Sequence, residues 1–282
     1  MNLIKIITDS TSDLPLSLLE KEKIPVIPLY ISFDDHTYRD GIDMTPAVLY
    51  DKVKATKALP KTAAPSPVDF RNVFESYIDQ GMDILYIGLS SKLSSTIQNA
   101  RIAASEFPEG RIEVIDSLNL SAGIGLLVIE ALDLVKTEKP LHEVATEIRH
   151  LIPKVTTYFA VDSLDYLHKG GRCSAASNFF GSILKIRPIL KVDGGKILLD
   201  QKVRGKRERL IKAMLDRIYA DQEKLNPKRV IINHSFCPKD AGYLKSELEK
   251  TLDIEEILMT TAGCVISSHC GPGTFSIVYS LK

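Results

Sequence analysis

Hydroxyl groups gather where short apolar runs end, and they are the residues of this sequence best suited to chemistry. Thr8-Asp9-Ser10-Thr11 follows the first apolar run, and Ser90-Ser91-Lys92-Leu93-Ser94-Ser95-Thr96 follows the run that ends at Leu89. Ligands of open parallel sheets bind beyond the carboxyl ends of the strands, and the start of a helix offers free N–H donors to an anion. The pattern therefore predicts a site for a carboxylate or a phosphate. Helix capping alone is the simpler interpretation of any one segment.

Two further segments, both expected to be loops, could each aim a single polar side chain. Thr62 lies just before Pro65 and Pro67, which stiffen the chain around it. His269 precedes Cys270-Gly271-Pro272-Gly273, where glycine lets the backbone approach another group closely. The histidine could donate to an anion, or it could satisfy buried backbone groups.

Several common catalytic patterns are missing from the sequence. It has no G-x-x-x-x-G-K-[ST] loop for nucleotide phosphates, and the serines after Gly88 lack the second glycine of a G-x-S-x-G nucleophile elbow. His234 with Cys237, and His269 with Cys270, could be imagined as zinc ligands, but they do not form the close-spaced pairs of a structural zinc site. We therefore expect no metal and no cofactor.

The overall charge does not point to sequence-independent binding to nucleic acid or membranes, so we expect no nucleic-acid partner. Lysine and arginine number 36, as do aspartate and glutamate, so the net charge is zero and no strong global field exists. One dense basic run stands out, formed by Lys202, Arg204, Lys206, Arg207 and Arg209. Such a run is usually a solvated face, but it could also dock an acidic partner or an anionic membrane surface.

Length and cysteine content suggest a cytoplasmic protein of two domains. A chain of 282 residues exceeds the usual ~100–200 residues of one domain. No apolar run approaches the ~18 residues of a membrane span, and the first run is too short for a signal peptide. The four cysteines form no C-x-x-C pair, which favours reduced thiols.

The elements that must position these residues alternate between apolar strands and amphipathic helices. Strands are expected at 3–8, 24–33, 83–89, 112–115 and 158–161, with a turn at 34–35; helices are expected at 12–22, from 45, at 66–81, 95–106, 122–136 and 141–151. Strands separated by helices indicate crossovers and a parallel sheet.

The pattern changes after about residue 163. A hairpin is expected at 189–203, followed by a helix at 206–223, a strand at 229–233, a helix at 241–252 and strands at 256–260 and 275–280. We therefore predict an α/β protein with two α/β domains, 1–163 and 164–282. The first domain should contain a mainly parallel sheet, and a cleft is expected between the two domains.

Segments along the whole chain resemble the DegV family, the fatty-acid-binding proteins of bacterial fatty acid kinases. The segments that carry the resemblance are Ile7-Thr8-Asp9-Ser10-Thr11, Lys61-Thr62-Ala63-Ala64-Pro65-Ser66-Pro67, the serine segment 90–96, Asp162-Ser163-Leu164-Asp165-Tyr166-Leu167 with Lys169-Gly170-Gly171-Arg172, Val203-Arg204-Gly205 and His269-Cys270-Gly271-Pro272-Gly273. Each motif is weak alone, but together they are specific.

The resemblance implies a two-domain α/β fold with a long-chain fatty acid between the domains. It implies that Thr62 and Ser94 hydrogen-bond the ligand carboxylate and that His269 lies close by. Two positions depart from the family pattern, since Ser95 replaces a frequent glycine and Ala64 a frequent glutamine. Ser95 could add a donor or narrow the pocket.

These observations predict a carrier rather than an enzyme. The chain would present the fatty-acid carboxylate to a separate ATP-dependent kinase, which would supply the nucleotide site. Only neutral hydroxyl donors and His269 are expected around the carboxylate, while Arg172, Arg204 and Arg207 are expected to dock the kinase. The alternatives are a hydrolase of lipid esters or acyl phosphates, with Ser94 as nucleophile and His269 as base, and a redox or zinc protein.

Overall fold

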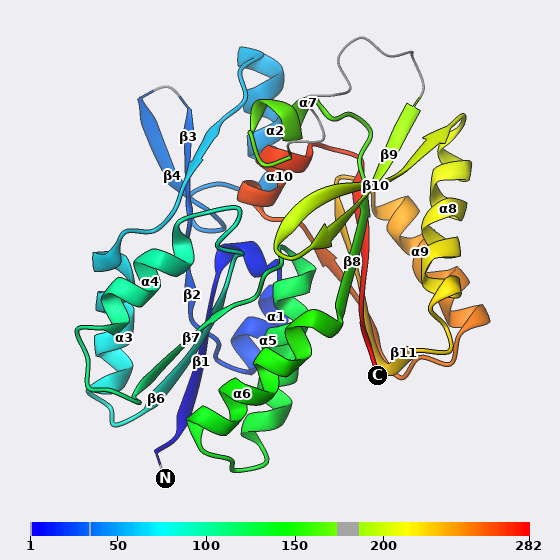
Figure 1. Ribbon diagram of the computed structural model, residues 1–282. Helices are drawn as coiled ribbons and strands as arrows, with labels where there is room; N and C mark the ends of the chain where they lie inside the picture. The colour runs from blue at the N-terminus through cyan, green and yellow to red at the C-terminus, as the bar shows by residue number, and fades with distance from the viewer. Residues whose placement is uncertain (1, 34, 174–185) are drawn as a thin grey trace.

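The first half of the chain builds a four-stranded parallel sheet covered by helices on both faces (Figure 1). The computed structural model describes residues 2–33, 35–173 and 186–282. The strand order is β2 (Val26–Ile27), β1 (Ile4–Asp9), β6 (Asp83–Gly88) and β7 (Ile112–Asp116). This confirms the predicted α/β class and the parallel N-terminal sheet.

Both faces of this sheet are buried, most completely along β6, which explains the apolar run Ile84-Leu85-Tyr86-Ile87 in that strand. On β6, Ile84 and Tyr86 face a cluster that includes Phe70 and Phe74, while Leu85 and Ile87 face the other side. The first face is covered by α3 (Pro67–Ile78) and α4 (Thr96–Ala104), and the second by α5 (Ala122–Val135) and α6 (Leu141–Leu151).

The second half of the chain builds a six-stranded mixed sheet. Its order is β10 (Lys196–Arg204), β9 (Ile186–Asp193), β8 (Val155–Ala160), β13 (Thr274–Leu281), β11 (Leu225–Ser235) and β12 (Ile257–Thr261). Its outer face packs against α8 (Arg207–Ala220) and α9 (Pro238–Thr251). Because β8 already belongs to this sheet, the chain changes sheets between Leu151 and Val155; the division at residue 163 stays a prediction.

Helix α5 lies between the two sheets and is buried on nearly all sides. Nine of its residues are buried, and it packs on β1 and β6 of the parallel sheet and on β8, β11 and β13 of the mixed sheet. A helix that is apolar all round requires such a position. The helix therefore forms much of the core shared by the two halves.

A small antiparallel sheet and three short helices stand at the upper end of the molecule in Figure 1. The sheet has the order β4 (His36–Arg39), β3 (Tyr30–Phe33) and β5 (Lys61–Ala63). The helices are α2 (Pro46–Thr56), α7 (Asp165–Lys169) and α10 (Cys264–Cys270). Asp34, in the expected turn between β3 and β4, lies outside the described residues.

Three local predictions were wrong. The helix expected from residue 12 begins only at α1 (Leu16–Lys21), because the Asp9 side chain accepts from the Thr11 amide and holds the 3-10 turn Ser10–Ser12. Thr62 lies on strand β5, paired with Ile31, instead of in a loop. His269 lies in the last turn of α10, and only the following Gly271, at φ +76°, leaves the helix.

A second 3-10 turn, Ile152–Lys154, connects α6 to β8. Within residues 2–33, 35–173 and 186–282, no helix combines the length and the apolar character needed to cross a membrane.

Candidate ligand-binding cavity

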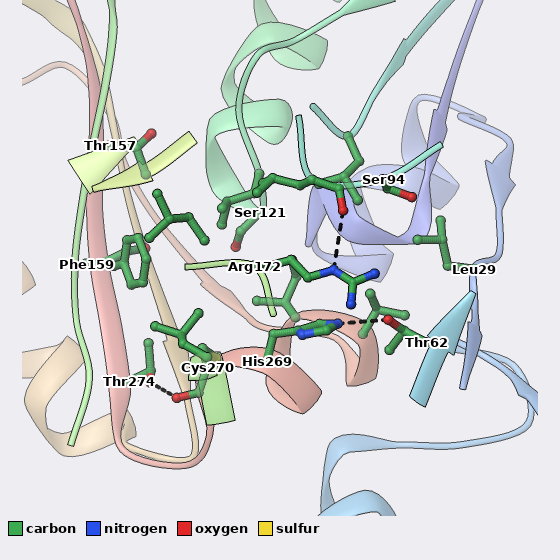
Figure 2. A pocket seen from close by; sticks show the side chains of 18 of the residues that line it. Leu29, Thr62, Ser94, Ser121, Thr157, Phe159, Arg172, His269, Cys270 and Thr274 are labelled. Atoms are coloured by element: carbon green, nitrogen blue, oxygen red, sulfur yellow. Dashed lines mark hydrogen bonds between the residues drawn. The ribbon is translucent and has the colours of Figure 1, made fainter. Parts of the chain in front are cut away.

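A cavity of about 450 Å³ lies between the parallel sheet and the inner face of the mixed sheet (Figure 2). Its volume falls within the ~300–1,000 Å³ typical of small-molecule sites. Residues that follow β6 and β7 line one side, as expected for the carboxyl ends of parallel strands. The apolar part of the lining includes Leu89, Leu120, Phe159, Ile197, Val265 and Val278.

All four residues predicted to hold a carboxylate line this one cavity. They are Thr62, Ser94, Ser95 and His269, and they come from three separate parts of the chain. Ser95 is exposed, as is Arg172, which also lines the cavity, so these two residues mark a side on which it meets solvent. Their role toward a ligand remains a prediction.

Thr62 and His269 form a hydrogen-bonded pair. Thr62 Oγ1 lies 2.8 Å from His269 Nε2, while His269 Nδ1 is buried and has no partner (Figure 2). Buried N–H donors are rarely left unpaired. The imidazole therefore carries its proton on Nε2 and donates to Thr62 Oγ1. This arrangement leaves the Thr62 hydroxyl proton free to donate into the cavity.

The imidazole of His269 is held in its neutral form. Burial, together with the nearby charge of Arg172, lowers the pKa of His269 to about 4. The group therefore contributes a hydrogen-bond donor and no positive charge near neutral pH.

Helix α10, which carries His269, is fixed at its other end by two buried aspartates. Asp13 accepts from the Gly263 amide at 2.8 Å, and Asp40 accepts from the Cys264 amide at 2.8 Å. Burial raises the pKa of both carboxyl groups. These residues belong to the N-terminal half, so α10 is anchored across the boundary between the two sheets.

In the serine segment, the side chain of Ser94 is hydrogen-bonded within the segment, whereas that of Ser95 is not. Ser94 Oγ lies 2.8 Å from Thr96 Oγ1 and accepts from the Thr96 amide at 3.3 Å. Ser95 is the N-cap residue of α4, but its side chain makes no capping bond. Asn99 on the same helix donates to the Pro65 carbonyl at 2.7 Å, which joins this segment to the one that carries Thr62.

The hydroxyl cluster that follows β1 has a structural role. Thr8 donates to the Ile87 carbonyl at 2.8 Å, and Thr11 bonds Asp9. Asp9 also accepts from Tyr86 Oη at 2.8 Å and from the Leu89 amide at 3.0 Å. These contacts join the ends of β1 and β6, and none of the four side chains Thr8, Asp9, Thr11 and Tyr86 lines the cavity.

The geometry gives no support to a Ser94–His269 hydrolase. His269 Nε2 is engaged by Thr62, and its other ring nitrogen faces Gly170, where an added Cβ would lie 2.3 Å from Nδ1. Ser94 bonds Thr96 instead of the imidazole. A nucleophile needs hydrogen-bond contact with its base, and this pair has none.

The three arginines expected to dock a partner lie in different settings. Arg172 lines the cavity and donates to the Gly170 carbonyl at 2.6 Å, which corrects the expectation of neutral donors only. Arg207 contacts Asp162 at 2.7 Å, Asp240 at 2.6 Å and the Gly273 carbonyl at 2.7 Å, so its donors are used inside the fold. Arg204 is exposed at the end of β10.

Several lining residues escaped the sequence analysis. Ser121, Thr157, Asn233 and Ser276 are polar, buried and part of the cavity wall. For Thr157, Asn233 and Ser276, the signal available in the sequence was a polar residue within a strand otherwise rich in apolar residues; Ser121 instead stands at the N-cap position of α5.

In the described part of the chain, no three histidine, cysteine, aspartate or glutamate side chains gather as metal ligands would. Cys264 and Cys270 are buried, and burial raises the pKa of Cys270 to about 12. Its thiol is therefore a poor nucleophile.

Together, the fold and the cavity define an α/β protein that encloses a mainly apolar site between two sheets, with hydroxyl and imidazole groups in its wall. A family model described as "Uncharacterised protein, DegV family" matches residues 3–282. The chain belongs to the DegV family.

Relatives match over the full length of the chain. A DegV domain-containing protein of Caldanaerobacter subterraneus subsp. tengcongensis is 33% identical over 100% of both chains. A structure described as fatty acid binding of a DegV family protein from Thermus thermophilus has 34% identity and a TM-score of 0.92, with 100% of both chains covered. DegV from Bacillus subtilis, described as a fatty acid binding protein, has 29% identity and a TM-score of 0.88, again with 100% of both chains covered.

The lowered pKa of His269 predicts an acid-sensitive fold in the ligand-free protein. Because the unfolded chain takes up this proton near pH 6.5 and the folded chain only near pH 4, stability should be full above pH 6.5 and fall as the pH drops toward 4. From pH 7 to pH 5 the loss should be about 2 kcal/mol. Urea unfolding at both pH values measures it.

His269→Asn serves as the comparison for this prediction. His234 is also buried, with its pKa lowered by burial, but it is present in both proteins. The variant should therefore lose less stability than the wild type over the same pH interval. Equal losses would show that His269 already carries its proton in the folded protein.

Proposed function

We propose that this chain binds one long-chain fatty acid in the cavity and holds its carboxylate at Thr62, Ser94, Ser95 and His269. The observation that carries the proposal is a mainly apolar cavity in which Thr62 and His269 form a neutral donor pair, with Ser94 and Ser95 in the same wall. The fatty-acid-binding relatives described above support it, since they share the fold over the whole chain.

The tail should supply most of the affinity and the polar groups should fix orientation. Burying an acyl chain at ~0.8 kcal/mol per methylene contributes on the order of 10 kcal/mol before the costs of association. Each hydrogen bond to a charged carboxylate adds only about 1.5–3 kcal/mol. A carboxylate bound through Thr62 and His269 would keep its position without a bidentate ion pair.

Delipidated protein provides the direct test. Calorimetry with long-chain fatty acids should show about one site per chain, and native mass spectrometry of protein purified from a bacterial host should show one added mass of fatty-acid size. An absence of binding to every long-chain fatty acid tested would refute the proposal. Hydrolysis of acyl esters that disappears in Ser94→Ala would establish the hydrolase instead.

We further propose that the chain is a carrier that presents the carboxylate to a separate, ATP-dependent fatty acid kinase in the cytoplasm. Support comes from the open side of the cavity, where Ser95 and Arg172 are exposed beside the carboxylate site. Arg204 is the exposed member of the basic run that best fits a docking role toward the kinase or an anionic membrane surface. Complementary charge would mainly raise the association rate.

Gly170→Ala should damage the proposed carboxylate site by displacing the His269 ring. Gly170 has φ −73° and ψ −15°, which alanine adopts readily, but its Cβ would lie 2.3 Å from His269 Nδ1 and 3.0 Å from the Tyr166 carbonyl. The imidazole must move and lose Thr62. Fatty-acid affinity should fall about tenfold.

Gly242→Ala on α9 is the matched control, since an added Cβ there has nothing within 4 Å. Calorimetry on both variants gives the comparison, and circular dichroism checks the fold. Wild-type affinity in Gly170→Ala would mean that the position of His269 does not matter for binding.

A further inference from the structure

The cavity wall formed by the mixed sheet carries several polar side chains. An alkyl chain alone would not need polar groups there. Ser276 on β13 pairs with Phe159 on β8 and with Asn233 on β11, so the three side chains form one row across the same face of the sheet. All three line the cavity, as does Thr157 two residues before Phe159. The row passes from an aromatic ring to a hydroxyl and then to an amide.

Most of these polar groups already have partners inside the protein. Thr157 donates to Asn119 Oδ1 at 3.0 Å, and the Asn233 amide donates to Thr260 Oγ1 at 2.7 Å. Ser121 donates to Asp13 at 2.5 Å. Ser276 differs, because its Oγ is buried without any hydrogen-bond partner and its residue is only 7% exposed.

A buried hydroxyl without a partner is costly, and an unsubstituted acyl chain would leave Ser276 in that condition. A neutral oxygen group on the ligand would remove this cost by forming one hydrogen bond with Ser276 Oγ. A charged group would not suit this wall, since the only arginine that lines the cavity in the described residues lies at the exposed side. The wall therefore favours a hydroxyl or a keto group.

The oxygen would sit along the chain and away from the carboxylate. In Figure 2, Phe159 and Thr274 lie across the cavity from Thr62 and Leu29. Ser276 pairs directly with Phe159 and stands two residues from Thr274 on the same strand, so it belongs to this distant wall.

We propose that Ser276 makes the cavity selective for a fatty acid that carries one hydroxyl or keto group within its chain. This inference rests on the proposed fatty-acid binding and adds the chemical class of the preferred ligand. The hydrogen bond forms at one chain position only, because the carboxylate end fixes how far the chain reaches.

The test compares octadecanoate with hydroxyoctadecanoates that carry the hydroxyl at successive chain positions, using the delipidated full chain and calorimetry. At one position the hydroxylated acid should bind about threefold to tenfold more tightly than octadecanoate. At the other positions a buried hydroxyl without a partner should weaken binding about tenfold or more.

Ser276→Ala should abolish the preference while keeping the affinity for octadecanoate. Ser280→Ala is the matched control, since Ser280 is a buried serine of the same strand that does not line the cavity; it should keep the preference. Ser276→Val is a second variant without the hydroxyl, and valine is favoured in β-strands; it should lose the preference as well.

Two results would overturn the inference: no hydroxylated acid binds as tightly as octadecanoate, or the preference survives in both Ser276 variants. The first would mean that a water already satisfies Ser276. Failure of every fatty acid to bind would instead refute the proposed function, so the two failures are distinguishable.

Discussion

With the carrier function proposed above, Thr62→Ala and Ser94→Ala should each slow kinase-dependent phosphorylation of the bound fatty acid by about 100-fold, while the fatty acid still binds. A displacement of the attacking oxygen by about 1 Å can cost ~100-fold in rate. Losing one contact to the carboxylate should reduce binding by only about 1–3 kcal/mol, because the buried tail still anchors the ligand.

The structure explains why Thr62 should be sensitive. Thr62 Oγ1 is the only hydrogen-bond partner of the His269 ring among the described residues, at 2.8 Å. Thr62→Ala deletes the hydroxyl and also leaves the imidazole of His269 without a hydrogen-bond partner. One donor to the carboxylate is therefore lost and a second is no longer held in place. Ser94→Ala also removes the contact with Thr96 and so loosens the start of α4.

The measurement is paired: affinity by calorimetry and phosphorylation rate with purified kinase, on the same preparations. Thr56→Ala and Ser105→Ala are matched controls, because both hydroxyls are exposed and bond only to nearby carbonyls or amides of their own helix ends. Wild-type phosphorylation in both the Thr62 and the Ser94 variants would show that neither hydroxyl holds the carboxylate.

Arg204→Glu should slow phosphorylation at low salt and leave the affinity for fatty acid unchanged.

Arg229→Ala should destabilise the whole protein by about 3 kcal/mol. Arg229 is 8% exposed and joins β11 to α5 through Glu130 and Asp133, and to Glu256 at 2.7 Å. Arg229 and Glu130 are largely buried, while Asp133 and Glu256 are partly exposed, so the loss should lie at the low end of the about 3–5 kcal/mol typical when one member of a buried ion pair is removed. Lys228, which contacts Glu130 at 2.9 Å, should offset part of this loss.

Urea unfolding of the delipidated protein measures the effect. Arg71→Ala is the control, because Arg71 is half-exposed and its ion pairs with Glu75 and Glu106 lie on the surface. Such pairs contribute about 0–1 kcal/mol. Equal losses in the two variants would mean that the Arg229 network does not stabilise the packing of α5 on β11.

Local sequence determined the class of fold and the polar residues worth considering. The mainly apolar runs within 4–9 and 83–88 reflect strands buried on both faces. The helices between them follow from amphipathic spacing and caps such as Ser66, which forms a capping box with Asp69. The serine segment 90–96, Thr62 and His269 stood out from residue types alone, while the resemblance to the DegV family singled out Ser94 and Ser95 within that segment. These signals act over a few residues and survive without tertiary context.

Other local signals misled for a physical reason. The hydroxyls after β1 resemble those of a ligand loop, but the buried Asp9 binds Thr11, Tyr86 and the Leu89 amide and uses them to join two strands. Arg207 resembled part of a basic docking patch, yet the fold brings Asp162 and Asp240 to it. In both cases the partner is more than 30 residues away for at least one contact.

Only the tertiary structure decided which polar residues face the cavity. Strand register places Ser276 beside Phe159 and Asn233, and the pairing of β5 with β3 brings Thr62 to His269, 207 residues later in the chain. Register depends on packing between distant segments, and a shift of one residue would turn every side chain to the other face. Sequence therefore determined the chemical groups, while the pairing of strands and the anchoring of α10 determined which of them meet around one ligand.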